Sequence, residues 1–126
     1  MKERRVDVAF WPAEEADGLA LFRKLQNKLA QKDFDDEYLK MLAEYRGKYP
    51  QSEHIGIFAG YFALYSGDVK EALALAQDAW QKRKCNLIIW HLLIECYDKL
   101  QMLPEKAKFQ GYCRHVYGMD VNLQID

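Results

Sequence analysis

The sequence has no excess of either charge sign. Its 126 residues include 18 lysines and arginines against 19 aspartates and glutamates, and both signs are spread evenly along the chain. It therefore lacks the basic arm or acidic tail that favours nucleic acid or a membrane surface. No apolar run approaches the roughly 18 residues of a membrane span. We expect no nucleic acid and no membrane among the partners.

Cysteine is also scarce. The three cysteines, Cys85, Cys96 and Cys113, are odd in number and none belongs to a CxxC motif. This pattern suits a reducing, cytoplasmic setting better than a disulfide framework. The first residues do not resemble a signal peptide, because Asp7 interrupts the short apolar stretch and Pro12 ends it. We expect a cytoplasmic protein.

Patterns typical of catalysis or metal binding are lacking as well. The sequence contains no glycine-rich phosphate loop. Among the three histidines only His91 has a residue at ligand spacing, Glu95, and such an i, i+4 pair is far more often a surface pair on a helix than a zinc site. Cys96 and Cys113 are interpreted as core residues. We expect no enzymatic activity, no metal and no cofactor.

What the chain does contain is apolar residues that recur three and four positions apart, the spacing of helices. With their flanking glycines, prolines and capping residues, these stripes predict helices at 13–31, 35–48, 52–66, 69–83, 86–100 and 104–117. Strand-like alternation occurs only at the two ends of the chain. We predict an all-α helical domain at 13–118, with an extended N-terminal arm at 1–12 and an extended C-terminal tail at 119–126.

The helical segments repeat. A shift of 34 residues aligns Phe22 with Gly56 and Trp90. The segment WHLLIECY, from Trp90 to Tyr97, resembles the opening W-x2-L-G-x2-Y of the tetratricopeptide repeat (TPR), with Ile94 in place of the glycine.

The resemblance to the TPR family covers residues 19–118 and is most specific in the middle unit. The run GDVKEA at 67–72 resembles the family's turn and the start of its second helix, and Pro50 falls at its closing proline. The resemblance implies a right-handed α-solenoid of three helix–turn–helix repeats, which is a helical repeat architecture.

Small residues gather on two of the predicted helices. Gly56 and Gly60 lie one turn apart on the third helix, and Ala72, Ala76 and Ala79 share one face of the fourth. A glycine inside a helix costs about 1 kcal/mol relative to alanine. Two of them on one face therefore indicate a close approach of the two helices.

The resemblance also implies that the first helix of each unit lines a concave surface that holds the ligand. Carried over by position, that surface contains Arg23, Asn27, Gln31, Ile57, Tyr61, Leu64, Tyr65, His91, Glu95, Asp98 and Lys99. Arg23 and Asn27 match the family's carboxylate clamp, but Phe58, Ile88 and Leu92 occupy its other positions and cannot donate side-chain hydrogen bonds. We expect instead an apolar groove for an extended or helical peptide. The alternative is that the chain's own termini cover the groove.

Three functions remain open. The first is a protein–protein interaction scaffold that binds a peptide segment or a partner protein in the groove. The second is the N-terminal domain of a longer, enzymatic polypeptide, suggested by the alternation near the C-terminus and by the missing capping helix. The third resembles the TPR chaperones of bacterial secretion systems, which have three units and an apolar groove. The alternating ends leave a monomer or a weak homodimer open.

Overall fold

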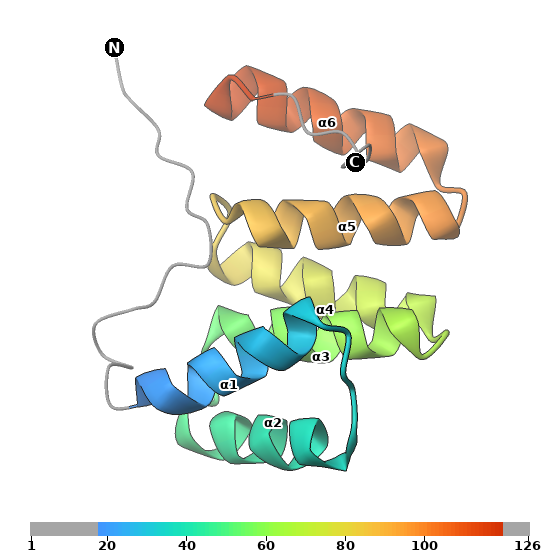
Figure 1. The fold of residues 1–126 in the computed structure, drawn as a ribbon. Coiled ribbons are helices and arrows are strands. Elements are labelled where there is room, and N and C mark those ends of the chain that lie inside the picture. The colour runs from blue at the N-terminus through green and yellow to red at the C-terminus, as the bar shows by residue number, and fades with distance from the viewer. Residues whose placement is uncertain (1–17, 120–126) are drawn as a thin grey trace.

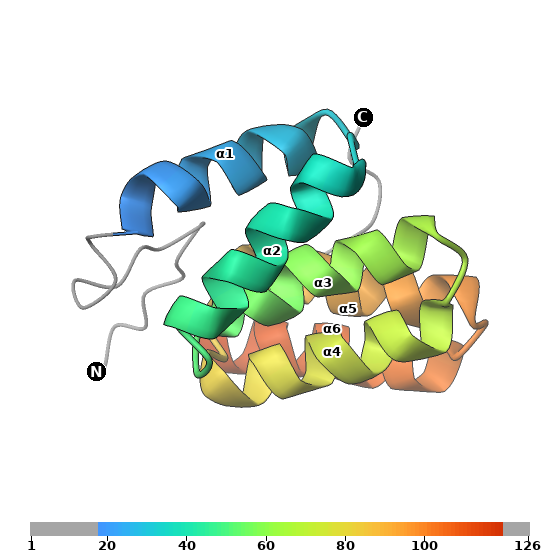
Figure 2. The ribbon, with the colours of Figure 1, turned by 90° about the horizontal axis from the view of Figure 1, so that it is seen from below.

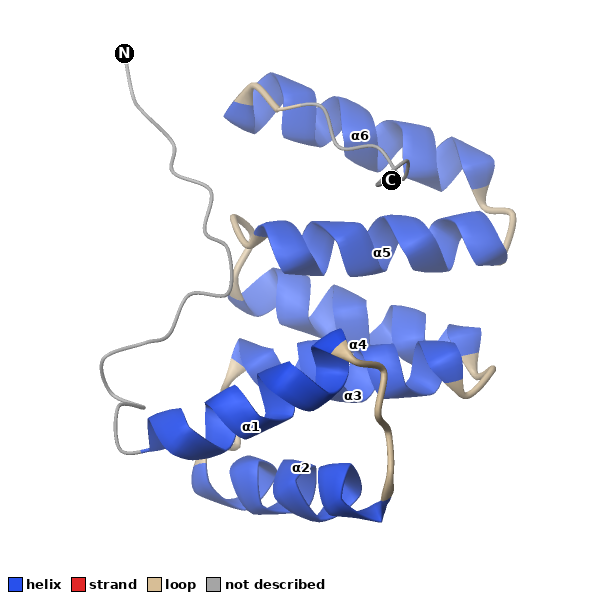
Figure 3. Cartoon of the chain, viewed as in Figure 1, coloured by secondary structure: helices blue, strands red, loops and turns tan. Residues whose placement is uncertain are grey.

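The computed structural model describes residues 18–119, so the predicted arm at 1–12 and all but the first residue of the predicted tail lie outside the described residues. The described residues form six helices and no strand (Figures 1 and 3). These are α1 (Leu19–Ala30), α2 (Asp36–Lys48), α3 (Glu53–Tyr65), α4 (Val69–Lys82), α5 (Leu87–Lys99) and α6 (Leu103–Tyr117). The all-α prediction is confirmed. None of these helices is both long and apolar enough to cross a membrane.

Local chemistry sets most of the helix boundaries. Four helices begin after a residue whose side chain accepts a hydrogen bond from a backbone N–H of the first turn, namely Asp35, Ser52, Asp68 and Asn86. α1 begins at Leu19, and residues 13–17, with which the prediction began this helix, lie outside the described residues. Gly18 precedes it with non-helical backbone angles and has no side chain to cap it.

The first helix of each successive pair ends in the same kind of turn. Lys32, Gly67 and Gln101 follow α1, α3 and α5 with φ angles of 55°, 94° and 58°. After each of them, the next N–H donates to the carbonyl five residues back, in the pairs Asp33–Lys28, Asp68–Ala63 and Met102–Tyr97. This is the Schellman arrangement of helix C-termini. A shift of 34 residues places Asp33 onto Gly67, whereas the residue with positive φ in the first unit is Lys32. The turn of the first unit therefore lies one residue earlier than the 34-residue period predicts.

The helices follow one another as three stacked pairs. α1 packs on α2, α3 on α4 and α5 on α6, while α2 also contacts α3 and α4 contacts α5. The first helices of the pairs also meet, since α3 contacts both α1 and α5. Figures 1 and 2 show this order, with α2 and α6 at opposite ends of the stack and α3 and α4 between them.

The core is divided into two clusters that meet at α3. The first lies between α1, α2 and α3 and includes Leu25, Tyr38 and Phe58. The Tyr38 hydroxyl donates to the Phe58 carbonyl at 2.6 Å, so this buried tyrosine has the polar partner that it needs. The second cluster lies between α3 and α6 and is centred on residues such as Trp90 and Ile94, both fully buried. α3 is consequently buried on most of its surface.

The predicted close approach occurs at Gly56. A Cβ atom there would lie 2.6 Å from Ala79 Cβ and 2.8 Å from the Leu75 carbonyl oxygen, both on α4. Gly60 makes room for a different helix, because its Cβ would lie 2.7 Å from Leu92 Cδ2 of α5 and 3.8 Å from the nearest α4 atoms. The two glycines therefore fit α3 against α4 at one turn and against α5 at the next.

Candidate functional site

A pocket of about 540 Å³ opens between α3, α5 and the turn after α1. Seven side chains line it: Lys32, Tyr61, Tyr65, His91, Glu95, Asp98 and Lys99. Six of these are among the positions that the sequence assigned to the ligand surface. Lys32 is the exception, because the sequence indicated only a helix break at that point.

Helical periodicity brings these side chains together. Tyr61 and Tyr65 are one turn apart on α3, and His91 and Glu95 are one turn apart on α5. A shift of 34 residues places Tyr61 onto Glu95 and Tyr65 onto Lys99. The two helices touch each other. Equivalent faces of two successive first helices thus form the facing walls of one pocket.

The α3 wall is aromatic. The Tyr61 and Tyr65 rings stack with centroids 6.2 Å apart and planes inclined by 18°, and Phe34 stacks on Tyr65 at 5.7 Å. The Lys32 ammonium lies 4.8 Å from the centroid of the Tyr65 ring, a cation–π contact. Tyr65 nevertheless remains 41% exposed. The aromatic row therefore presents a large surface to anything that enters the pocket.

The turn that carries Lys32 is tied down by charge. Lys28, which precedes the turn, has its Nζ 3.2 Å from a carboxylate oxygen of Asp33 and 2.9 Å from one of Asp35. Both aspartates follow Lys32 in the sequence. These hydrogen bonds raise the pKa of Lys28 and lower that of Asp35. The ion pairs link the end of α1 to the start of α2, and so fix the position from which Lys32 reaches Tyr65.

The α5 wall carries three of the four charged side chains that line the pocket. Asp98 is paired with Lys106 of α6, with 3.0 Å between Oδ1 and Nζ. Within the described residues 18–119, neither Glu95 nor Lys99 forms an ion pair. Glu95 is half-buried, whereas Lys99 is exposed. The Glu95 carboxylate is therefore the shielded, uncompensated charge of this site.

The charge of Glu95 acts on its neighbours. Burial raises the pKa of the Tyr61 hydroxyl, and the Glu95 carboxylate raises it further. Burial lowers the pKa of His91, while Glu95 opposes that shift. His91 is consequently neutral at pH 7, and its Nδ1 is buried with no hydrogen-bond partner among the described residues. Tyr61 and His91 thus offer uncharged polar atoms in the same pocket as the Glu95 carboxylate.

Five predicted residues do not line the pocket. Ile57 and Leu64 are 3% and 4% exposed and belong to the second core cluster. Their side chains pack in the core and do not line the pocket. Arg23 and Asn27 on α1, and Gln31 directly after it, are exposed but do not line the pocket either. Phe22, Gln26 and Leu29 form the side of α1 that faces α3. Their packing fixes the rotation of α1 about its axis.

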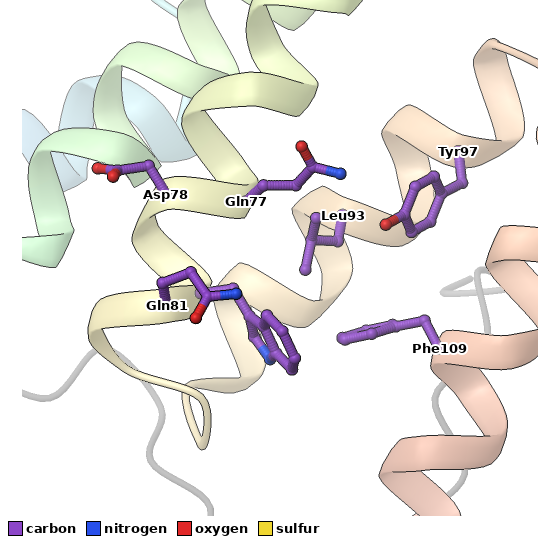
Figure 4. Close-up of a pocket in the computed structure, with 7 residues that line it drawn as sticks. Gln77, Asp78, Gln81, Leu93, Tyr97 and Phe109 are labelled. Atoms are coloured by element: carbon purple, nitrogen blue, oxygen red, sulfur yellow. The ribbon is translucent and has the colours of Figure 1, made fainter.

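A second pocket, of about 330 Å³, lies between α4, α5 and α6. Its walls include Gln77 and Gln81 of α4, Leu93 and Tyr97 of α5, and Phe109 of α6 (Figure 4). Trp80 adds an aromatic edge, with its ring centroid 5.8 Å from that of Phe109. No binding site was predicted from the sequence at this position. The 34-residue shift relates Leu93 and Tyr97 to Ala59 and Ala63, which line a comparable cleft of about 390 Å³ between α2 and α4.

Metal-binding groupings are not found in the described part of the chain, and Cys96 and Cys113 are buried. Residues 18–119 contain no cluster of three or more histidine, cysteine or acidic side chains that could hold a metal ion. Burial raises the pKa of Cys96 and of Cys113 to about 12, so both thiols are protonated at neutral pH. A protonated, buried thiol is a poor nucleophile. These cysteines serve as core residues.

Comparison with protein-family models, with curated proteins and with solved structures finds no match for the chain. The basis for a functional proposal is therefore the pocket between α3 and α5.

Proposed function

We propose that the chain is a protein–protein interaction module of the cytoplasm. Its six helices form a right-handed α-solenoid of three TPR-like units, and the pocket between α3 and α5 binds a peptide segment of a partner protein. The observation that carries the proposal is the convergence of six residues, chosen by their position in the repeat, on one pocket.

The repeated turns support the solenoid. Left-handed residues follow α1, α3 and α5 at nearly constant spacing, namely Lys32, Gly67 and Gln101. The contacts have the same period, since α3 packs on α1 and α5 in turn. In stacked repeats each unit contacts mainly its neighbours, and the order of helices in Figure 1 fits that description.

The composition of the pocket supports a peptide as its ligand. Peptide recognition uses a main-chain track together with pockets for individual side chains. Here an aromatic wall with a hydroxyl at Tyr61 faces a polar wall with the buried His91 Nδ1 and three charged side chains. Tyrosine is also among the residues that most often dominate binding energy at interfaces. The pocket is open and is lined from two helices, which suits an extended segment better than an enclosed small molecule.

The proposal is tested by selecting binders from a displayed library of random peptides on the immobilised full chain. The Kd of each selected peptide is then measured for the wild-type chain and for Tyr61→Ala and Tyr65→Ala. We expect each substitution to weaken binding at least roughly tenfold, the scale of an interface residue that contributes more than about 1 kcal/mol.

The matched control is Gln81→Ala, which removes a lining residue of the pocket between α4 and α6 and should leave the affinity unchanged. Selected peptides that bind the two tyrosine variants as tightly as the wild-type chain would place the ligand elsewhere and contradict the proposal.

A further inference from the structure

The charges of the α3–α5 pocket are unevenly compensated. Of its two carboxylates, Asp98 already has a partner in Lys106, whereas Glu95 has no ion pair within residues 18–119. Of its two lysines, Lys32 rests on the Tyr65 ring, and Lys99 is exposed to solvent. The end of the pocket near Tyr61 and His91 thus holds the negative charge of Glu95, which acts on both side chains.

Glu95 and Lys99 differ in what they offer a ligand. An ion pair with an exposed lysine contributes little, because water and salt screen it. A half-buried carboxylate is screened less, and a hydrogen bond to it is charge-assisted and correspondingly stronger. A cation bound at Glu95 therefore gains more than an anion bound at Lys99.

The aromatic wall favours the same sign of charge. The face of a tyrosine ring attracts cations. The chain itself demonstrates this in the pocket, since Lys32 Nζ lies 4.8 Å from the centroid of the Tyr65 ring. Tyr61 is the next ring along the wall, stacked on Tyr65, and it is the ring whose hydroxyl feels the charge of Glu95. A carboxylate and an aromatic ring thus lie close together at this end.

We infer that the pocket recognises a basic side chain, lysine or arginine, of the bound peptide, and that its cationic group is held between the Glu95 carboxylate and the Tyr61 ring. This inference rests on the proposed peptide-binding function and adds the chemistry of the ligand. Neutral His91 contributes no competing positive charge at this end.

The test uses the peptides selected on the full chain. We expect them to share one lysine or arginine. Replacing that residue of the peptide with glutamine should weaken binding roughly tenfold or more, the size of one hydrogen bond to a charged group. Because this change is made in the peptide, it does not depend on how any protein variant folds.

The protein side of the test is Glu95→Gln, which keeps the shape of the side chain and removes its charge. This variant should weaken binding of the basic peptide by a similar factor and leave the affinity of its glutamine version unchanged, so that the two losses do not add. The control Asp78→Asn removes a carboxylate from the pocket between α4 and α6 and should leave both affinities unchanged.

Two outcomes would overturn the inference and leave the proposed function intact: selected peptides that need Tyr61 but share no basic residue, or acidic peptides whose binding is lost in Lys99→Gln. Peptides that bind independently of both Tyr61 and Tyr65 would instead contradict the proposed function itself.

Discussion

Replacing Gly56 with alanine should destabilise the protein, although alanine is the better helix former. In an open helix the substitution stabilises by about 1 kcal/mol. At position 56, however, the new methyl carbon would lie 2.6 Å from Ala79 Cβ and 2.8 Å from the Leu75 carbonyl oxygen. Carbon atoms normally pack about 3.5–4.0 Å apart, so α3 and α4 must separate by close to 1 Å. The carbonyl belongs to the backbone of α4 and cannot rotate away.

The magnitude follows from two opposing terms. Overpacking of a close-packed interior costs about 1–3 kcal/mol, and the backbone contact of Gly56 puts it at the upper end of that range. Subtracting the gain in helix propensity leaves a net loss of about 2 kcal/mol. Gly111→Ala in α6 is the matched control, because a Cβ there would have no neighbour within 4 Å. That variant should gain up to about 1 kcal/mol.

Urea denaturation of the full chain followed by circular dichroism measures both variants. A protein of this size loses about 1–2 kcal/mol of stability per molar urea, so the two midpoints should differ by at least about 1 M, with Gly56→Ala the lower. Gly60→Ala should fall between them, because its close neighbour is the flexible end of Leu92. The larger change Gly60→Leu should cost more than about 1 kcal/mol. Equal midpoints for Gly56→Ala and Gly111→Ala would refute the close contact between α3 and α4.

Three further substitutions test the core and the pocket. Tyr38→Phe removes the hydroxyl that donates to the Phe58 carbonyl and should cost about 1 kcal/mol in the same assay, whereas Tyr65→Phe, on the exposed wall, should cost nothing measurable. His91 is held neutral by burial, with its pKa below the ordinary value of about 6.5. As the pH falls below that value the unfolded chain binds the proton first, so stability decreases. His91→Gln should remove this part of the loss between pH 7 and pH 5, and identical pH profiles for the two proteins would contradict the assignment.

The helical boundaries could be predicted because they depend on local chemistry. Asp35, Ser52, Asp68 and Asn86 each satisfy an N–H of the turn that follows, and this requirement is visible in the sequence. For α1 the structure describes the chain only from Gly18, so the predicted helix start at residue 13 lies outside the described residues.

The pocket was predicted in part, and the misses have a common cause. Nearly all of α3 is apolar, so periodicity could not tell which of its residues face the core and which face the pocket. Ile57 and Leu64 turned out to be core residues, while Tyr61 and Tyr65 line the pocket. Lys32 was missed because its place depends on a turn with positive φ, for which lysine gives no sequence signal.

Arg23 and Asn27 illustrate a different limit. Their assignment assumed that α1 has the same rotation about its axis as the other first helices. In the structure that rotation is set by the burial of Phe22 and Leu25 against α2 and α3, which leaves Arg23 and Asn27 exposed outside the pocket. A repeat period fixes where helices begin and end, but each helix's own core residues fix which of its faces meets the next unit.

The tight contact of α3 with α4 and the pocket of α3 with α5 are properties of one helix. Gly56 lets α3 lie against the backbone of α4, and Gly60, one turn later, lets Leu92 of α5 fit against the same helix. Tyr61 follows immediately and begins the aromatic wall. Because α3 is held from both sides, the rings of Tyr61 and Tyr65 are positioned before any ligand arrives, and a site that is already ordered loses less entropy on binding. The small residues that indicated a close approach of two helices thus also hold in place the aromatic wall of the pocket for which we propose peptide binding.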